Sequence, residues 1–313
     1  MARVDVSIIV PVYNAEKYLE RCLISIVNAL KEYNGSSEII VVDNMSQDGS
    51  IDIINKYANK YPKLVKPIRC TTPGAGAARN LAIKKSSGRF FWFVDADDEI
   101  RHDAVSMLVD EITTSKADFV MLGMSKIYPD NHRDIVHAPL STSNDFRSRF
   151  IRSELGPVQV FVRKSWYVKN NFVFCEGMIH EDMEMMPALI LYTDNFSSID
   201  EPLYLYHQNI NSTLHKVKWD AHYFDIFPAL EGLYARFSNA GAINTYYAEL
   251  EWFFIWNLLM DSAEYFHKFK EGRGGRELSR KMLKKYFPKW RHNKFLKNVN
   301  IKTKIKIFVN YYI

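Results

Sequence analysis

The strongest constraint on the fold is an alternation, over the first hundred residues, between short β-branched runs and longer segments of helical period. Strands that alternate with helices are joined by crossover connections, so this pattern predicts a mostly parallel sheet with helices on both faces, an α/β fold. Asn14 is a candidate N-cap for the first helix. The expected strands are Val6–Val10, Glu38–Asp43, Leu64–Cys70 and Phe90–Val94, and the expected helices are Leu19–Leu30, Ser50–Tyr61 and Ala77–Lys85.

The pattern changes after the fourth strand. We expect an irregular insertion with a short helix in residues 129–157, and a helical region beyond Trp219. Between these lies a mixed stretch that includes an apolar segment at Phe172–Phe174. The further expected elements are helices at Asp103–Ser115, Glu181–Tyr192 and Tyr246–Phe266, and strands at Asp118–Lys126, Val158–Arg163 and Leu203–Tyr206.

Composition narrows the class of protein. A chain of 313 residues with 47% apolar and 25% charged residues can bury a proper core, which excludes disordered and disulfide-rich classes. Its three cysteines lack the spacing of zinc ligands and suit a reducing cytoplasm. No apolar stretch reaches the roughly 20 residues that span a bilayer, so we expect a cytoplasmic protein, soluble or peripheral on the membrane.

The charge is unevenly distributed. Residues 266–313 carry a net charge of +13, whereas residues 1–265 carry −8. Aromatic residues are interleaved with the basic ones, which favours binding to an anionic membrane surface or a phosphate-rich polymer over a merely solvated helical face. These aromatic residues are Phe266, Phe269, Tyr286, Phe287, Trp290, Phe295 and Phe308.

An aromatic ring and several carboxylates follow three of the expected parallel strands, at the edge where ligands collect in such sheets. The segments that carry them are Pro11–Asn14, Asp43–Asn44 and the acidic run Asp95–Asp98. Carboxylates this close repel one another unless a cation or ribose hydroxyls satisfy them, although they could also cap the following helix. Carboxylate and phosphate oxygens are the ligands that Mg²⁺ or Mn²⁺ prefers, so the run predicts a divalent-metal site.

Two other motifs carry chemistry. Gly74–Arg79 imitates a dinucleotide-binding loop, but Arg79 replaces its third glycine and the motif follows the third strand, so it is better read as a turn that delivers a planar cation. His180-Glu181-Asp182 lacks the second histidine of a zinc-protease motif. Its carboxylates could supply a general base or could stabilise a helix N-terminus, and the residues alone leave both open.

Taken in order, the motifs resemble family 2 of the inverting glycosyltransferases, which have the GT-A fold, in the branch that builds bacterial surface polysaccharides. The likeness covers about residues 5–215 and leaves the last hundred residues unmatched. The segments that carry it are Val6–Asn14, Ile39–Ser50, Gly76–Ala82, Ser87–Phe90, Phe93–Asp98 and Glu181–Asp182.

The resemblance assigns roles to these residues. It implies that Pro11 and Tyr13 pack on the nucleotide base, that Asp43 accepts a ring N–H of uracil, and that Arg79 reaches the nucleotide. Asp95 would contact the ribose or the metal, and Asp97 would hold the Mn²⁺ or Mg²⁺ that bridges the diphosphate. Asp182, beside Glu181, would take the proton of the acceptor hydroxyl in a single displacement that inverts the anomeric configuration.

Two departures from the family pattern bear on the site. Asn44-Met45 stands where a second aspartate is common, which leaves Asp43 untouched. In the segment Tyr204–His207, with Asn211-Ser212-Thr213 after it, His207 replaces an arginine that contacts the diphosphate in the family. His207 could bind phosphate or metal, and a structural role is the better reading.

The expected organisation is a GT-A catalytic domain in residues 1–218, with a nucleotide-sugar half in 1–127 and an acceptor half in 128–218. A helical, basic region follows in residues 219–313. The expected activity is metal-dependent transfer from a UDP-sugar to a hydroxyl of a lipid-linked or oligosaccharide acceptor in capsule, O-antigen or exopolysaccharide synthesis, at the inner face of the membrane and without nucleic acid. The alternatives are a non-catalytic nucleotide-sugar-binding subunit and a sugar nucleotidyltransferase, although the latter normally has a glycine-rich loop and lysine after its first strand.

Overall fold

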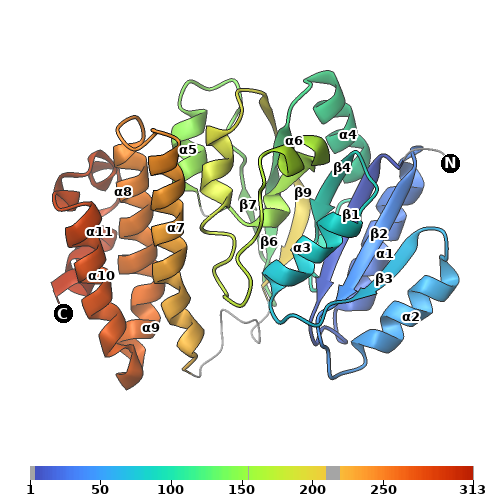
Figure 1. The fold of residues 1–313 in the computed structure, drawn as a ribbon, viewed down its shortest axis with the longest axis horizontal. Coiled ribbons are helices and arrows are strands. Elements are labelled where there is room, and N and C mark those ends of the chain that lie inside the picture. The colour runs from blue at the N-terminus through green and yellow to red at the C-terminus, as the bar shows by residue number, and fades with distance from the viewer. Residues whose placement is uncertain (1–3, 154, 209–218, 313) are drawn as a thin grey trace. The chain divides into compact units, whose positions relative to one another are not determined.

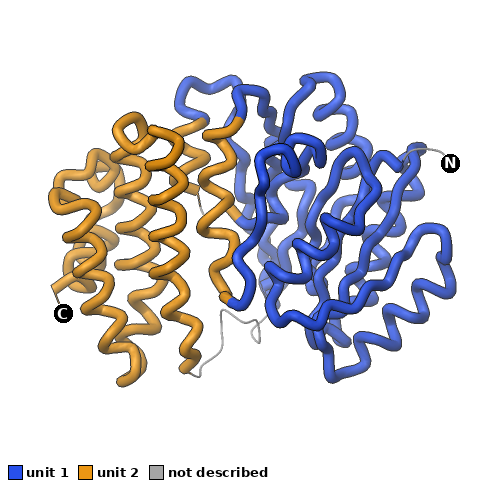
Figure 2. The backbone as a smooth tube through the Cα atoms, viewed as in Figure 1, with its two compact units in different colours: residues 1–146, 156–177, 193–215 blue, residues 147–155, 178–192, 216–313 orange. Residues whose placement is uncertain are grey.

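A computed structural model of the chain describes residues 4–153, 155–208 and 219–312 (Figure 1). The chain divides into two compact units (Figure 2), each described here by itself. The first comprises residues 1–146, 156–177 and 193–215, and the second comprises residues 147–155, 178–192 and 216–313. The domain boundaries expected from the sequence stay a prediction.

The first unit is built on one sheet. In the described residues its strands lie in the order β3-β2-β1-β4-β8-β6-β9-β5, with β7 paired to β6. The strands are β1 (Val6–Val12), β2 (Ser37–Asp43), β3 (Val65–Arg69), β4 (Phe90–Phe93), β5 (Glu99–Ile100), β6 (Phe119–Ile127), β7 (Arg133–Val136), β8 (Val160–Arg163) and β9 (Phe196–His207).

The strands β1 to β4 form a parallel group within the sheet. β1 pairs in parallel with β2 and with β4, and β2 pairs in parallel with β3. β8 is antiparallel to β4 and β6, while β6 and β9 are parallel. The carboxyl ends of β1 to β4 therefore meet at one edge, which we call the carboxyl edge, as the alternating pattern predicted.

Helices cover both faces of this sheet, which confirms the expected α/β class. On one face Ile8 and Val10 of β1 share a core with apolar residues of α1, α2 and α4. On the other, Phe91 of β4 makes an edge-to-face contact with Tyr167 of α6. The helices of the first unit that follow or cover these strands include α1 (Leu19–Glu32), α2 (Ser50–Lys60), α3 (Ala75–Lys85), α4 (Ala104–Thr114) and α6 (Lys164–Lys169).

Three local expectations need correction. Asn14 does not cap α1, because the helix begins at Leu19 and Asn14 adopts a left-handed backbone with φ 49°. The helix expected at Glu181–Tyr192 is a series of turns followed by a 3₁₀ helix at Met186–Leu191, since Pro187 has no N–H to donate in an α-helix. The insertion at 129–157 holds the short helix α5 (Phe146–Arg152), but it also holds β7.

The second unit is helical, as expected beyond Trp219. In the described residues its long helices are α7 (Ile226–Asn239), α8 (Tyr247–Trp256), α10 (Arg273–Tyr286) and α11 (Ile301–Tyr312), with α9 (Ser262–Lys268) joined to α8 by a π-helical turn at Asn257–Asp261.

Three of the aromatic residues named for the basic tail are internal. Phe266, Phe287 and Trp290 are buried, and rings from α7 and α8 pack against the first two. These three rings therefore stabilise the second unit and are not part of a membrane-binding surface. Within the described part of the chain, no helix has both the length and the apolar character needed to cross a bilayer.

A buried carboxylate fixes the opposite edge of the sheet, the amino edge. Glu38 at the start of β2 accepts hydrogen bonds from Ser7 Oγ at 2.6 Å and from the Ser87 N–H at 2.5 Å, and Lys66 pairs with it. Burial opposes ionisation, but the hydrogen bonds from Lys66 and Ser7 outweigh it and lower the pKa of Glu38. The carboxylate thus ties three neighbouring chain segments together.

Gly88 completes this arrangement and yields a stability prediction. A Cβ atom at Gly88 would lie 2.6 Å from Ser7 Oγ and 2.7 Å from the Phe90 carbonyl oxygen, so Gly88→Ala should lower the free energy of unfolding by about 1–3 kcal/mol. Gly156→Ala is the matched control, since its Cβ would meet nothing closer than Val158 Cγ2 at 3.8 Å. Urea denaturation measures both, and equal stability of the two variants would contradict the prediction.

Candidate functional site

The loops after β1 and β2 are bonded to each other at the carboxyl edge. The Asn14 N–H donates to Ser46 Oγ at 3.1 Å, and Asn14 Oδ1 accepts from the Gln47 N–H at 2.8 Å. The Glu16 N–H donates to Asp48 Oδ2 at 3.0 Å. Side chains therefore satisfy backbone groups that have left the sheet, and the two loops hold each other in place.

Asp43, Pro11 and Tyr13 lie on these two loops. Asp43 ends β2 opposite Val12, is buried, and accepts the Ser46 N–H on Oδ1 at 3.1 Å. Tyr13 is 63% exposed, and Pro11 is partly buried in β1. The predicted base-binding residues thus come from adjacent strands, with an exposed aromatic ring on the loop next to a fixed carboxylate.

Asn44 connects the second loop to the third. Its Nδ2 donates to the Thr72 carbonyl at 2.7 Å, and its Oδ1 accepts from the Gly74 N–H at 2.9 Å. Gly74 has φ 103°, a left-handed conformation that favours glycine, and α3 begins directly after it. The amide uses both a donor and an acceptor here, which an aspartate could not do while ionised.

Arg79 of α3 reaches the acidic run after β4. Its side chain is buried, with Nη2 3.1 Å from Asp95 Oδ1, and its guanidinium lies over the rings of Phe93 and Phe174 at 5.7 and 5.5 Å. The neighbouring Asn80 holds Phe174 by paired hydrogen bonds to its backbone. The turn therefore delivers a cation to the carboxyl edge, as predicted, and the arginine orients Asp95.

The carboxylates of the acidic run differ in environment. Asp98 is fully buried and accepts from the Tyr204 hydroxyl at 2.6 Å and from the His207 N–H at 2.8 Å. Burial, together with the charges of Asp95 and Asp97, raises the pKa of Asp98 to about 8. Asp95 and Asp97 are only partly buried. Asp98 is thus an internal brace between the acidic run and β9.

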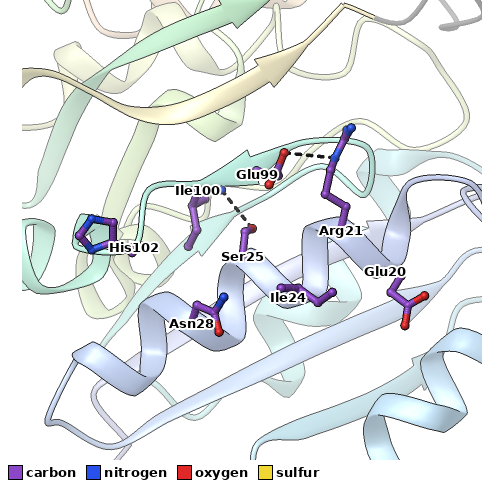
Figure 3. A pocket seen from close by; sticks show the side chains of 8 residues that line it. All are labelled: Glu20, Arg21, Ile24, Ser25, Asn28, Glu99, Ile100 and His102. Atoms are coloured by element: carbon purple, nitrogen blue, oxygen red, sulfur yellow. Dashed lines mark hydrogen bonds and ion pairs between the residues drawn. The ribbon is translucent and has the colours of Figure 1, made fainter.

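A second brace comes from α1 and borders a pocket of about 520 Å³ (Figure 3). Arg21 donates from Nη2 to the Asp97 carbonyl at 2.6 Å, and its Nε lies 3.2 Å from Glu99 Oε1. His207 Nε2 lies 2.7 Å from the same Glu99 oxygen, and burial and the charge of Arg21 lower the pKa of His207. The described contacts give His207 a structural role in this network. Asn211-Ser212-Thr213 lies outside the described residues.

Glu181 and Asp182 belong to the second unit. Asp182 is partly buried at the first of the turns before Met186–Leu191, and its carbonyl accepts N–H groups from Met185 and Met186 at 3.0 and 2.8 Å. Glu181 is buried. Their role as catalytic base stays a prediction, as do the roles assigned to the residues of the first unit.

Several residues of this site carried no sequence signal that we used. Arg21 and Asn80 are placed by contacts with segments 76 and 94 residues away in the chain. In the described residues, no group of three or more His, Cys, Asp or Glu side chains is arranged to hold a metal ion.

Comparison with known proteins agrees with this geometry. The model of the family described as "Glycosyl transferase family 2" matches residues 7–172, more than half of the chain. The chain belongs to that family. The predicted family and enzyme class, a glycosyltransferase, are thereby confirmed.

Several relatives are named. Over 170 residues the chain is 34% identical to a poly(ribitol-phosphate) beta-glucosyltransferase of Bacillus spizizenii, covering 53% of this chain and 26% of that protein. It is 28% identical over 252 residues to the uncharacterized glycosyltransferase EpsJ of Bacillus subtilis, covering 76% and 72% of the two chains. The chain thus spans about a quarter of the first relative's length.

Solved structures share the fold. The structure of residues 1–349 of Staphylococcus aureus TarS in complex with UDP-GlcNAc aligns with 98% of this chain and 79% of that one, at a TM-score of 0.59 and 21% identity. The mannosyltransferase PcManGT from Pyrobaculum calidifontis, in complex with GDP-Man and Mn²⁺, aligns with 99% and 88%, at a TM-score of 0.54 and 16% identity. These likenesses confirm the expected GT-A fold.

Asn44 both donates and accepts a hydrogen bond through its side-chain amide, so we expect that an aspartate at this position, as is common in the family, lowers the stability of this chain. In Asn44→Asp a carboxylate would face the Thr72 carbonyl in a buried position, so the free energy of unfolding should fall by about 2 kcal/mol or more. Urea denaturation at neutral pH measures it, with the exposed helical Asn55→Asp as control. A variant as stable as the wild type would show that the amide donor is not needed.

His180, two residues before Asp182, predicts a pH dependence of stability. Burial lowers the pKa of His180 to about 4, against the opposing charge of Asp225, so the unfolded chain binds more protons between that value and about 6.5. This contribution to the free energy of unfolding therefore falls as the pH drops from about 6.5 towards 4.

His180→Gln should flatten that dependence. Urea midpoints at pH 7 and pH 5 measure it, and the exposed His292→Gln, also in the second unit, should keep the wild-type slope. An unchanged slope in His180→Gln would mean that this histidine is not the titrating group.

Proposed function

We propose that the chain is a metal-dependent, inverting glycosyltransferase that moves one sugar from a UDP-sugar to a hydroxyl of a bacterial cell-surface polymer or its lipid-linked or oligosaccharide precursor. The observation that carries this proposal is the set of mutually bonded loops at the carboxyl edge. They gather an exposed aromatic ring at Tyr13, a buried carboxylate at Asp43 and the Arg79–Asp95 pair. No nucleic-acid partner is proposed.

The base is proposed to lie between Tyr13 and Asp43. The exposed ring offers a stacking surface, with Pro11 beside it, and a buried carboxylate can accept the ring N–H of uracil, which cytosine and adenine lack. Asp43 Oδ1 already accepts one backbone N–H, which fixes the direction of the carboxylate before the nucleotide arrives. The structure of TarS with UDP-GlcNAc supports a uridine-linked donor.

The residues of the acidic run fit a divalent cation. Asp98 is buried and its two oxygens accept bonds from Tyr204 and His207, whereas Asp97 and Asp95 are partly exposed. Asp97 and Asp95 are the carboxylates that would hold the metal, together with diphosphate oxygens. Arg21 holds the Asp97 backbone and Arg79 holds Asp95. Bound Mn²⁺ or Mg²⁺ supplies Lewis-acid stabilisation of the departing diphosphate, and the Mn²⁺ in the PcManGT structure supports such a metal.

Asp182, with Glu181 beside it, is proposed to take the proton of the acceptor hydroxyl as that oxygen attacks the anomeric carbon. The new C–O bond forms as the bond to the nucleoside diphosphate breaks, which inverts the configuration without a covalent enzyme intermediate. We place this chemistry in residues 1–218, with the nucleotide-sugar half in 1–127 and the acceptor half in 128–218.

The acceptor proposal draws on the relatives. A poly(ribitol-phosphate) beta-glucosyltransferase acts on a polymer rich in hydroxyl and phosphate groups, and a TarS relative carries the name poly(ribitol-phosphate) beta-N-acetylglucosaminyltransferase. Membership of the glycosyltransferase family favours glycosyl transfer to an acceptor over the alternative activity, a sugar nucleotidyltransferase. A peripheral place on the inner face of the cell membrane would bring the enzyme to lipid-linked acceptors.

The first test is a panel of nucleotide sugars with Mn²⁺, with Mg²⁺ and with a chelator. Ligand that binds only the folded chain stabilises it by about 2.7 kcal/mol at a hundredfold excess over Kd, so one UDP-sugar with metal should raise the thermal midpoint and be hydrolysed slowly. If none of the nucleotides raises the thermal midpoint under any condition, the proposal is contradicted.

Matched variants separate the roles. Asp97→Asn should abolish the metal-dependent shift, whereas Asp182→Asn should keep the shift and lower turnover about 10²–10⁴-fold. The exposed Asp52→Asn on α2 is the control and should behave as wild type. Donor binding without any turnover in the wild type would instead favour a non-catalytic binding subunit.

A further inference from the structure

α11 carries apolar residues on two opposite sides. Ile307 is fully buried against the second unit, and Asn310 Nδ2 of the same helix donates to the Leu259 carbonyl at 2.7 Å. On the outward side four large residues are exposed, at spacings of four, four and three that place them on one face of a helix. This exposed stripe consists of Ile301 (69% exposed), Ile305 (57%), Val309 (42%) and Tyr312 (63%).

The exposed stripe is bordered by cations. Lys302 and Lys306 are exposed on α11, at helical positions adjacent to the stripe. Residues 278–313 contain eleven Lys and Arg and neither Asp nor Glu. Arg291 donates from Nε to the Tyr312 hydroxyl at 3.1 Å and lies 4.8 Å from the centre of the Tyr311 ring.

We propose that α11 lies in the interface of an anionic phospholipid bilayer, with the exposed stripe in the acyl boundary and the lysines among the lipid phosphates. An apolar helix face that is flanked by basic residues, with no acidic ones, is typical of helices that lie in a membrane interface. The long side chains of the flanking lysines can reach the lipid headgroups. A hydrophilic polyanion would use the lysines but leave the isoleucines in water, and a second copy would bring like charges together.

The test uses the full chain and does not depend on catalysis. The chain should co-sediment with vesicles of phosphatidylglycerol and phosphatidylcholine in equal parts, and much less with phosphatidylcholine alone. Raising NaCl from about 0.1 to 1 M shortens the screening length from about 10 to 3 Å, so binding should weaken. Amide hydrogen exchange should slow in residues 301–312 of the wild type when anionic vesicles are added.

Two pairs of substitutions assign the surface. Ile305→Ser/Val309→Ser should weaken vesicle binding at least tenfold, and Lys302→Gln/Lys306→Gln about thirtyfold at low salt. Ile51→Ser/Val168→Ser removes exposed aliphatic residues from α2 and α6 and should bind as wild type. Donor hydrolysis without membranes should be unchanged in all three, which keeps this test separate from the proposed function.

Several outcomes would overturn the proposal. These are absence of binding to anionic vesicles, equal binding by the serine variant of the stripe, or unchanged exchange in residues 301–312. Light scattering tests one more outcome. If the wild type is a dimer that does not bind vesicles, and Ile305→Ser/Val309→Ser is a monomer, the stripe is the contact surface with a second copy of the chain. Binding to a soluble polyphosphate as strong as to vesicles would assign the lysines to a polymer.

Discussion

The candidate donor site depends on one requirement, that backbone N–H groups leaving the parallel sheet at its carboxyl edge find acceptors. Here the acceptors are side chains of the neighbouring loops. Asn14 exchanges hydrogen bonds with the loop after β2, and Asn44 does the same with the turn before α3. Because each loop is held by the next, the loops that carry Tyr13 and Asp43 are ordered before any ligand arrives. A preordered site spends less of its binding free energy on fixing loops.

The same principle divides labour within the acidic run. Its sequence suggests equivalent carboxylates, yet Asp98 is enclosed by Tyr204 and the His207 backbone, Asp95 faces Arg79, and the Asp97 backbone is held by Arg21. Two cations and a buried hydroxyl thus compensate for the repulsion among three carboxylates. Asp97 and Asp95 are partly exposed at the carboxyl edge, where a diphosphate and its cation are proposed to bind.

Much of the fold and part of the site could be predicted from the sequence. Hydrophobic periodicity reports local burial, so it located β1 to β4 and α1 to α4, and the carboxyl-edge rule then grouped Asp43 with Asp95. The bracing by Arg21, Asn44 and Asn80 could not be predicted, since it depends on contacts between distant segments. The helix expected at 181–192 failed for a local reason, because apolar spacing suggested it and Pro187 prevents it. The burial of Phe266, Phe287 and Trp290 could not be predicted either, because composition does not tell an internal ring from an exposed one.

The two edges of the sheet are held by different means, and this has an evolutionary consequence. At the amino edge, the buried Glu38 ties Ser7, Ser87 and Lys66 together, and Gly88 leaves no room for a side chain. At the carboxyl edge the bonds run from side chains on the loops to backbone groups of the neighbouring loops. Side chains that take no part in these bonds, such as the exposed Tyr13, can therefore change at the carboxyl edge while the amino edge maintains the fold. A lineage could diversify its chemistry without first gaining extra stability.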